Sequence, residues 1–599
     1  MGDYTVIGID FGTSTTVVKT KNYGEGVDLD NWKDVQFNNS NSLPTLIFEA
    51  GEDGRLSYGY QAEIDYESDL QMDNDKKGRL HKYFKMDLIS ADPGTKKKAE
   101  ELTSAFFVYL HDTLVEQGQT LHIKPETKTY ISFPAKWKPD LRRFMKKCAE
   151  DAGFKNVEGV FEPTAAVYAS MSECCGKLQD LQIIIKNKPV NIIMLDMGAG
   201  TTDIAIFKFK IDNDGKLIGD EEKTVTWPAP GNYNCGGKEI DEVYLTDELR
   251  GHIAKIAKDR KVSEFADYAI KTSVKRWKEY NVSRSLGEKK STGLPAPVAT
   301  HIKQNKASGA YENLPFEDID RKRFELITEK HWKEFRTLID ESLREASKEL
   351  SDFKGAEDVD LVILTGGHSQ WYGVKEFILG EKFAGCEPIN FAKIRQNPVR
   401  LLQMASPQET VAKGLVFKDL GFNLKNTMGK SLWVQYDYCG HKSDLVKIIG
   451  HHDVLPIKNF SLPSYEFNIE RHMLETGKLP FYCHCYYGED PESAKLEVWG
   501  GGKELQTAAG QIFSRILFPP LIIADGIRVI GRIVSGDESW TNNMFTIGVF
   551  PSVNVPEDGS TVEITVTLKS KNAGDDDWKK VTPFKITLGE DTLGGDTNE

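Results

Sequence analysis

The chain contains 599 residues, well above the roughly 250 to 300 at which a single hydrophobic core stops growing, so at least two domains are expected. The 90 Asp and Glu residues outnumber the 76 Lys and Arg residues and give a net charge of −14, which argues against a nucleic-acid-binding surface. The sequence has no signal-peptide pattern at its start and no apolar run near the roughly 18 residues of a membrane span. A cytoplasmic location is therefore expected.

The first informative segment, residues 7–18, reads IGIDFGTSTTVV: an apolar run, an acid, a small polar turn and a second apolar run. Residues 191–207 read NIIMLDMGAGTTDIAIF and repeat this arrangement. Both fit the pattern DxGxxTT, which begins at Asp10 in the first segment and at Asp196 in the second. The interval between them is far longer than the roughly 20 to 50 residues of a solenoid repeat. We therefore expect two halves of one domain, each presenting a turn to a shared cleft.

Each of these turns offers groups that bind phosphate. Glycines let backbone N–H groups approach closely, Thr and Ser hydroxyls add donors, and a carboxylate at a strand end can hold hydrated Mg²⁺. The chain has no GxxxxGK[ST] loop, and strands rather than helices are expected after the turns, at residues 17–19 and 204–209. A single DxGxxTT segment also suits an ordinary hairpin turn. Two in matching contexts indicate a nucleotide site.

Two further segments support an α/β domain with a cleft. Glu162 precedes Pro163 in EPTAAVYASM, as expected where a helix begins. Residues 359–364 form an apolar strand, followed by a turn at Gly366 and Gly367 and then a helix pattern. Open α/β sheets bind ligands at the carboxyl ends of their strands, although an ordinary strand-to-helix turn has the same pattern.

The pattern changes after residue 417. From residue 431 to about 590 the chain consists of short segments rich in Val, Ile, Phe and Tyr, separated by Gly, Asn, Asp and Pro. This pattern predicts a β-sandwich, with residues 418–430 as a linker. The tail at 591–599 has the composition of a disordered segment.

The cysteine and histidine residues of the C-terminal region could suggest a metal site. The group comprises Cys439, His441, Cys483, His484 and Cys485. On a strand, Cys483 and Cys485 would point to one face and His484 to the other, and CxC is not the usual CxxC zinc motif. Ordinary reduced cysteines are therefore favoured over a zinc site.

Seven segments resemble, in order and rough spacing, the ATPase domain of the heat shock 70 (DnaK-like) chaperones, which belong to the actin-like ATPase superfamily. They are IGIDFGTSTTVV, ISFPAKWKPDLRR, FEPTAAVYA, IIMLDMGAGTTDIAIF, CGGKEID, DRKRFELI and LVILTGGHS. The resemblance implies a two-lobed actin-like (ribonuclease H-like) ATPase domain at residues 1–417. It also implies that the mostly-β sandwich at 431–590 is a peptide-binding domain, here with no helical lid after it.

The function implied by this resemblance is that of a molecular chaperone. Such a protein binds Mg-ATP, hydrolyses it slowly with a positioned water, and couples nucleotide state to binding of unfolded or extended polypeptide clients. Cochaperones and a nucleotide exchange factor are the implied partners, without nucleic acid or membrane. The alternative is an actin-like ATPase that polymerises, or a sugar-kinase-type phosphotransferase, because fold alone does not separate these functions.

The resemblance also assigns roles to residues of the cleft. Asp10 and Asp196 hold Mg²⁺ through water, and Asp203 and Glu162 orient water and metal ligands. The nucleotide-binding residues are Gly12, Thr13, Ser14, Gly198, Gly200 and Thr201 at the phosphates, and Gly236, Gly237, Lys278, Gly366, Gly367 and His368 around the ribose and adenine.

The phosphate-site lysine of the family lies in a segment where this sequence matches poorly. The segment reads KKGRLHKYFKMDLI, and within it Lys85 is preferred over Lys77 and Lys82. Pro134 and Arg142 match the proline switch and arginine relay that report nucleotide state in this family.

Three positions depart from the family around the base. Gln370 stands where the family has an arginine that stacks on adenine, Gln408 where it has an acid, and Lys275 where it has a glutamate. We therefore expect intact phosphate chemistry, slow turnover and a weaker preference for adenine.

Overall fold

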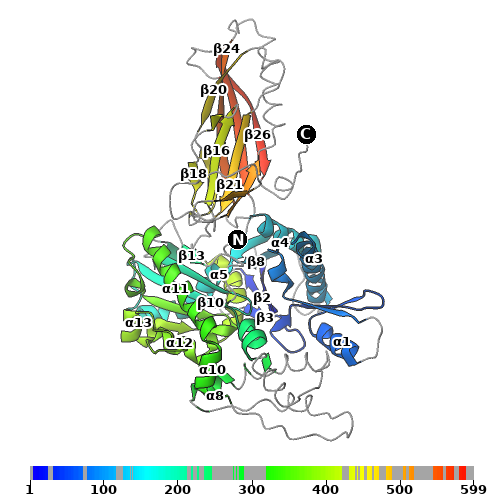
Figure 1. The fold of residues 1–599 in the computed structure, drawn as a ribbon, viewed down its shortest axis with the longest axis vertical. Helices are drawn as coiled ribbons and strands as arrows, with labels where there is room; N and C mark the ends of the chain where they lie inside the picture. The colour runs from blue at the N-terminus through cyan, green and yellow to red at the C-terminus, as the bar shows by residue number, and fades with distance from the viewer. Residues whose placement is uncertain are drawn as a thin grey trace. The chain divides into compact units, whose positions relative to one another are not determined.

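The structure, a computed structural model, describes most of the chain up to residue 420 and a set of strands beyond it (Figure 1). The chain divides into two compact units. The first comprises Met1–Pro134, Lys147–Glu221 and Val225–Leu424, and the second comprises Ala135–Lys146, Glu222–Thr224 and Lys425–Glu599. The described residues are 4–24, 32–71, 77–116, 126–134, 137, 139–211, 217–219, 225–227, 235–245, 274–275, 278, 282–288, 290, 319–420, 431–438, 441–442, 446–450, 453, 455–461, 464–470, 481–488, 504–506, 512–517, 544–556, 562–572 and 579–587.

The first unit contains a sheet with strand order β3-β2-β1-β8-β9, in which β4 also pairs with β2. β1 and β2 form an antiparallel hairpin, whereas β8 runs parallel to β1 and β9 runs parallel to β8. A parallel neighbour requires a crossover, and the segments leading to β8 and β9 carry helices. The strands are β1 (Tyr4–Phe11), β2 (Thr15–Tyr23), β3 (Trp32–Asp34), β4 (Ser42–Pro44), β8 (Lys128–Phe133) and β9 (Val157–Phe161).

A second sheet of the same unit repeats this topology, with the order β12-β11-β10-β14-β15 and with β13 paired to β11. β10 and β11 form an antiparallel hairpin, and β14 and β15 continue the sheet in parallel. The repeated DxGxxTT pattern therefore reflects a repeated topology. The strands are β10 (Val190–Met197), β11 (Thr202–Ile211), β12 (Leu217–Gly219), β13 (Val225–Trp227), β14 (Leu361–Thr365) and β15 (Leu401–Gln403).

One hydrophobic core joins the two sheets through helices α5 (Glu162–Asp180) and α14 (Thr410–Phe417). The two helices approach so closely that a Cβ added to Gly414 would lie 1.7 Å from the carbonyl oxygen of Ala165. Only glycine permits this contact. The start of α5 at Glu162 confirms the helix boundary predicted from the sequence.

The outer face of each sheet is covered by other helices (Figure 1). In the first half, Phe106 and Phe107 of α3 (Pro93–Glu116) pack on Phe11 at the end of β1, with ring centroids 5.7 and 5.4 Å away. In the second half, successive residues of β10 point to opposite faces of the sheet. Ile192 packs in the core that contains α5, and Ile193 packs in a second core formed with the other helices. These helices include α10 (Arg321–Ile327), α11 (Glu329–Glu349), α12 (Tyr372–Ile378) and α13 (Ala392–Gln396).

The remaining described elements of the chain up to residue 420 are short, apart from two helices. A small sheet has the order β6-β5-β7 and lies before the segment that carries Lys85. These elements are β5 (Leu46–Glu49), β6 (Leu56–Tyr58), α1 (Gly59–Gln71), β7 (Arg79–Lys82), α2 (Phe84–Asp87), α4 (Pro139–Ala152), the π-helix η1 (Glu239–Leu245), α8 (Ser283–Gly287), η3 (Ala356–Asp358), η4 (Gly367–Gln370), η5 (Pro398–Arg400), η6 (Pro407–Glu409) and η7 (Lys418–Leu420).

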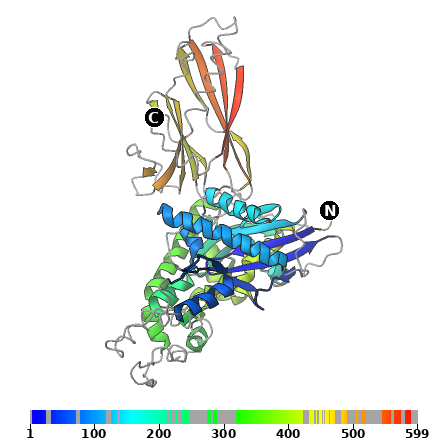
Figure 2. The same cartoon turned by 90° about the vertical axis from the view of Figure 1, so that its right-hand side faces the viewer.

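Every described element from residue 431 onward is a strand, as the sequence pattern predicts. One sheet has the order β17-β16-β21-β23-β22 with β18 on β16, and the other has the order β19-β24-β25-β26 with β20 on β24 (Figure 2). The predicted sandwich packing and the missing lid stay predictions. The strands are β16 (Ser431–Tyr438), β17 (His441–Lys442), β18 (Val446–Ile449), β19 (Ile457–Ser461), β20 (Tyr465–Glu470), β21 (Phe481–Gly488), β22 (Glu504–Gln506), β23 (Ile512–Leu517), β24 (Met544–Val555), β25 (Glu563–Asn572) and β26 (Lys579–Thr587).

The mixed α/β architecture predicted from the sequence is confirmed by the two repeated sheets and their helices. None of the helices in the described part of the chain combines the length and apolarity that a membrane span needs.

Candidate functional site

The two DxGxxTT turns have the same local geometry. The backbone N–H of Gly12 donates to the carbonyl of Thr15 at 3.1 Å, and that of Gly198 donates to Thr201 at 2.9 Å. A Cβ on Gly12 would lie 2.3 Å from the Thr15 carbonyl oxygen, so this position accepts no side chain without opening the turn. A strand follows each turn, as predicted. The carbonyl of Ser14 also accepts a hydrogen bond from the backbone of Thr45, at 3.0 Å.

The two turns lie against each other and against the start of η1. A Cβ on Gly200 would lie 3.0 Å from the Thr13 hydroxyl, and one on Gly236 would lie 2.7 Å from the Gly200 carbonyl oxygen. The N–H of Gly237 donates to the carbonyl of Gly198 at 3.0 Å. Segments far apart in the sequence thus meet around one small group of glycines. This arrangement suits the close approach of phosphate oxygens to backbone donors.

Each turn is preceded by a half-buried aspartate at the end of its strand. The Ser132 hydroxyl, at the end of β8, donates to Asp10 Oδ1 at 2.7 Å. Asp196 lies beside Gly366, whose φ of 77° is in the left-handed region and whose added Cβ would lie 2.8 Å from Asp196 Oδ1. The glycine after β14 is therefore required for close packing against the second aspartate. Beside it, Gly367 has open space where a Cβ would point.

Of the three candidate lysines, Lys85 is the one that is buried at this site. Its Nζ donates to Glu162 Oε1 at 2.8 Å, and the two side chains are 7% and 10% exposed. Lys77 is exposed and donates to the Asp69 carbonyl, and Lys82 forms an ion pair with Glu242. The structure thus joins α2 and the start of α5, which carry the predicted lysine and glutamate.

The carboxylates of the site repel one another strongly. Burial and the charge of Glu162 raise the pKa of Asp10 to about 6 and that of Asp203 to about 7. Burial, together with Glu162, Asp203 and Asp10, raises the pKa of Asp196 well above its usual range. Burial acts to lower the pKa of Lys85, but Glu162 and Asp10 outweigh it and the pKa is raised. One ammonium group therefore faces four carboxylates, and the site has an excess of negative charge.

This donor set fits a hydrated Mg²⁺ better than a fully protein-bound metal. Among the described residues, no three His, Cys, Asp or Glu side chains are grouped closely enough to hold a metal ion. Magnesium keeps several waters and is commonly bound by one or two carboxylates together with substrate phosphates. The half-buried carboxylates of Asp10 and Asp196, with their raised pKa values, would supply the oxygen ligands and the charge that such an ion neutralises.

The residues predicted around the ribose and adenine form a buried polar cluster. Lys278 Nζ donates to the Gly237 carbonyl at 3.1 Å and pairs with Asp241 at 2.5 Å. The Nε2 atoms of His368 and His331 are 3.0 Å apart. Burial lowers the pKa of His331 to about 3 and that of His368 well below its usual value, so both rings are neutral. The His368 ring therefore points into the protein interior, where it also stacks on Trp332.

The three positions predicted to depart from the family, Gln370, Gln408 and Lys275, are exposed. Gln370 Nε2 donates to Gln408 Oε1 at 3.2 Å, so two of the departures contact each other as a neutral amide pair. Lys275 lies on the surface. Pro134 is buried after β8, and the Arg142 side chain is fully buried in α4.

Sequence reasoning missed several residues that contact the predicted ones. Ser132 lies inside the segment ISFPAKWKPDLRR, and Asp241 is the last residue of CGGKEID. The resemblance thus included both residues, but it did not predict their contacts with Asp10 and Lys278. His331, Tyr83 and Glu242 had no signal, because an isolated His, Tyr or Glu in a helix pattern is most often an ordinary structural residue.

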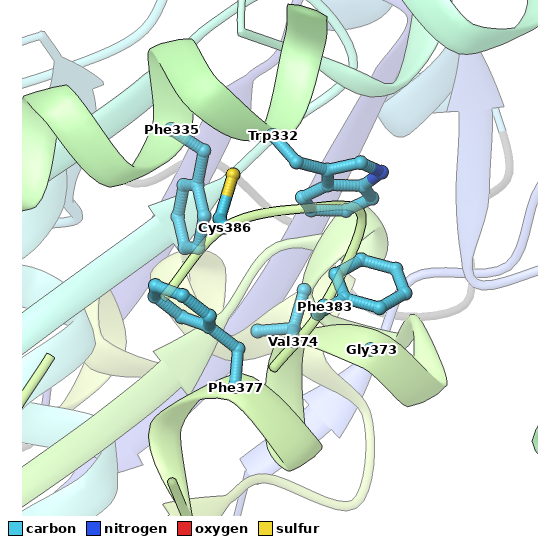
Figure 3. Close-up of a pocket in the computed structure, with 7 residues that line it drawn as sticks. All are labelled: Trp332, Phe335, Gly373, Val374, Phe377, Phe383 and Cys386. Carbon is cyan, nitrogen blue, oxygen red and sulfur yellow. The ribbon is translucent and has the colours of Figure 1, made fainter. Parts of the chain in front are cut away.

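Two other features lie away from the carboxylates. Cys439 is outside the described residues, and the side chains of His441, Cys483, His484 and Cys485 are not described, so the disfavoured zinc site is not tested. An apolar pocket between α11 and α12 contains no charged side chain (Figure 3). It is lined by Trp332, Phe335, Gly373, Val374, Phe377, Phe383 and Cys386.

Comparison with known proteins relates this geometry to one family. Residues 85–390 match the family described as Hsp70 protein. The chain is 24% identical over 385 residues to the chaperone protein DnaK of Mycoplasmopsis pulmonis (strain UAB CTIP). This match covers 63% of this chain and 55% of that protein. It is 25% identical over 257 residues to DnaK of Thermosipho africanus (strain TCF52B), with 42% and 36% covered. It is 27% identical over 267 residues to DnaK of Thermotoga neapolitana, with 44% and 37% covered. The matches thus span about half or less of these relatives' length.

Proposed function

Because the chain belongs to the Hsp70 protein family and is a divergent, Hsp70-like member with an actin-like fold, we propose that it is a DnaK-like chaperone ATPase that binds and slowly hydrolyses Mg-ATP. One observation carries the proposal. The buried ion pair of Lys85 and Glu162 interacts electrostatically with three half-buried aspartates, Asp10, Asp196 and Asp203, beside two paired, glycine-rich turns. Such a site is suited to phosphoryl transfer, which depends mainly on positioning and on charge neutralisation.

In this proposal the turns and the carboxylates have separate tasks. Backbone N–H groups and hydroxyls at Gly12–Ser14 and Gly198–Thr201 bind phosphate oxygens, apart from the N–H groups of Gly12 and Gly198, which close the turns. Asp10 and Asp196 hold Mg²⁺ through water, and this ion, when bound, neutralises charge on the phosphates. Lys85, oriented by Glu162, adds positive charge beside the terminal phosphate.

Asp203 is the proposed group that positions the attacking water. Its carboxylate accepts a hydrogen bond from the Thr201 hydroxyl at 3.1 Å, which fixes its orientation. Its pKa of about 7 suits a group that accepts a proton near neutral pH. The ribose and base are proposed to lie on Gly236, Gly237 and the backbone of the segment from Gly366 to His368, with Lys278 holding Gly237 in place.

The domain assignment is likewise a proposal. Residues 1–417 form the ATPase domain, 418–430 the linker and 431–590 a β-domain that binds extended polypeptide. The sheets described beyond residue 431 support this, since an extended peptide can pair with a strand edge or occupy a groove beside it. Pro134 and Arg142 are the proposed relay of nucleotide state. A cytoplasmic location stays a prediction.

The first experiment measures metal-dependent ATP turnover of the full chain and of the Asp196→Asn variant. Loss of one carboxylate from the metal site should lower turnover by about a hundredfold at fixed Mg²⁺ while the protein remains folded. The matched control is Asp112→Asn, which makes the same change on an exposed position of α3. Turnover in Asp196→Asn equal to that of the control would refute the site assignment.

A second experiment separates the chaperone from the alternatives. An unfolded peptide should stimulate ATP turnover of the full chain, and ATP should change the affinity for a labelled peptide. Sedimentation of the protein on addition of ATP would indicate a filament, and phosphorylation of a compound in a sugar panel would indicate a kinase. A chain that hydrolyses ATP but ignores a broad peptide array would contradict the client-binding part of the proposal.

A further inference from the structure

The segment just before Lys85 is connected to η1, which belongs to the opposite half of the ATPase unit. The Tyr83 hydroxyl donates to Glu242 Oε1 at 3.0 Å. Lys82 Nζ donates to the same oxygen at 2.7 Å. A single carboxylate of η1 thus binds two consecutive residues that immediately precede α2. This contact brings together residues more than 150 positions apart in the chain.

Tyr83 also has an unusual backbone conformation. Its φ is 62° and its ψ is 17°, in the left-handed region that aromatic residues rarely adopt. The backbone N–H of Met86 donates to the Tyr83 carbonyl at 2.8 Å, so this residue sets where α2 begins. The direction of Lys85, two residues later, follows from that turn. A conformation of this kind persists where surrounding contacts fix it, and the Glu242 contact is one that fixes Tyr83.

A second contact holds the other side of the lysine. Met86 Sδ lies 3.1 Å from Lys238 Nζ, and the same ammonium lies 4.8 Å from the centre of the Tyr83 ring. The backbone N–H of Lys238 donates to the carbonyl of Ala199 at 2.9 Å, inside the second DxGxxTT turn. Lys85 therefore lies in the chain between Tyr83 and Met86, which contact Glu242 of η1 and Lys238 just before η1. Lys238 is in turn hydrogen-bonded to the second glycine turn.

We propose that Tyr83 and Glu242 form a positioning pair that orients Lys85 toward the phosphate site when the two halves of the ATPase unit are together. The proposal rests on the ATPase function above and extends it. Neither residue touches the reacting atoms. Tyr83 acts through the backbone turn that begins α2, and Glu242 acts by holding the Tyr83 hydroxyl.

Two variants test the pair in the full chain. Tyr83→Phe removes the hydroxyl, and Glu242→Ala removes the carboxylate that accepts its hydrogen bond. Single-turnover ATP hydrolysis should fall by about tenfold in each, because a shift of the lysine by a fraction of an ångström weakens its contact in the transition state. Equilibrium affinity for ATP should change by less than about twofold, since backbone donors supply most of the binding. The double variant should be no slower than the single ones.

The control is Tyr60→Phe, which also removes a tyrosine hydroxyl with a 3.0 Å hydrogen bond, here to the Ser42 carbonyl. A second readout that does not require activity is amide hydrogen exchange at Met86, which should become several-fold faster in Tyr83→Phe than in the control. A parent chain without ATP turnover would refute the proposed ATPase function. Amide hydrogen exchange at Met86 would still show whether Tyr83 fixes the turn before Lys85. Unchanged exchange, or equal hydrolysis rates in Tyr83→Phe and Tyr60→Phe, would overturn the inference.

Discussion

The two glycine turns share one scaffold but carry different charge. In the register of the hairpins, Asp10 lies opposite Val17, whereas Asp196 lies opposite Asp203. Like charges directly opposite each other on two strands destabilise a sheet. The first turn thus combines one acid with an apolar neighbour, and the second retains an unfavourable pair. The two halves share the same strand topology, but the proposed water-positioning residue, Asp203, occurs only at the second of these two turns.

The third strands show the same asymmetry. Ser132 on β8 and Thr365 on β14 occupy equivalent positions beside the two aspartates. The Ser132 hydroxyl donates to Asp10, but the Thr365 hydroxyl donates to the Pro407 carbonyl at 2.9 Å. Asp10 thereby gains a donor that favours its ionised form, which helps to explain why the pKa of Asp196 is raised further.

The largest expected effect comes from making the first turn resemble the second. Val17→Asp would place a second carboxylate opposite Asp10 at a position that is 1% exposed. We expect a loss of about 3–5 kcal/mol in the free energy of unfolding, because the new charge is buried without a cation. Val17→Thr, which keeps the shape without the charge, is the control in denaturant unfolding. Equal losses in the two variants would mean that charge is not the cause.

The next effect comes from the opposite change, which removes one of the two facing aspartates, Asp196 and Asp203, from the second turn. The folded-state pKa of Asp203 is raised to about 7, so its contribution to stability is present below its unfolded pKa near 4 and is lost as pH rises through 7. Without Mg²⁺, Asp203→Asn should therefore be more stable than the parent at pH 8 by about 1–3 kcal/mol, and this difference should be clearly smaller at pH 5. Thermal unfolding at both pH values measures this. Added Mg²⁺ should narrow the gap at pH 8, and a gap that is the same at both pH values would contradict the assignment.

A smaller effect is expected at the third strands. Ser132→Ala removes the hydrogen bond to Asp10 and should cost about 1–2 kcal/mol at pH 8, where Asp10 is ionised. The cost should decrease below pH 6, because the carboxyl group becomes protonated as pH falls through its pKa of about 6. Thr365→Ser, which retains the hydroxyl in the second half, serves as the control. A cost at Ser132 that does not vary with pH would show that the hydroxyl does not act on the Asp10 charge.

The smallest effect concerns the proposed base-binding side of the site, which we assign to residues of the second half. The neutral pair Gln370 and Gln408 lies where the resemblance to the family predicts charged residues, so we expect the parent chain to discriminate ATP from GTP by less than about tenfold. The double variant Gln370→Arg with Gln408→Asp should increase that ratio by a few-fold. Competition between the two nucleotides gives the ratio directly. A parent chain with strong discrimination would end the idea that these positions weaken the preference for adenine.

The sequence predicted the parts of the site that depend on local pattern. The two hairpins and the start of α5 follow from apolar runs, glycines and a proline within a few residues of each other. Family resemblance alone assigned Lys85 and Glu162 to one site, because 77 residues separate them and no periodicity connects them; their direct contact was not predicted. The left-handed turn at Tyr83 and the His331 contact with His368 were not predictable, since both depend on how distant elements pack.

The close crossing of α5 and α14 has a mechanical consequence. At Gly414 and Ala165 the two helices meet backbone to backbone, with no interlocking side chains at that point. A side chain at position 414 would push the two helices apart and open the core that joins the sheets, so the spacing between the two sheets depends on this one glycine.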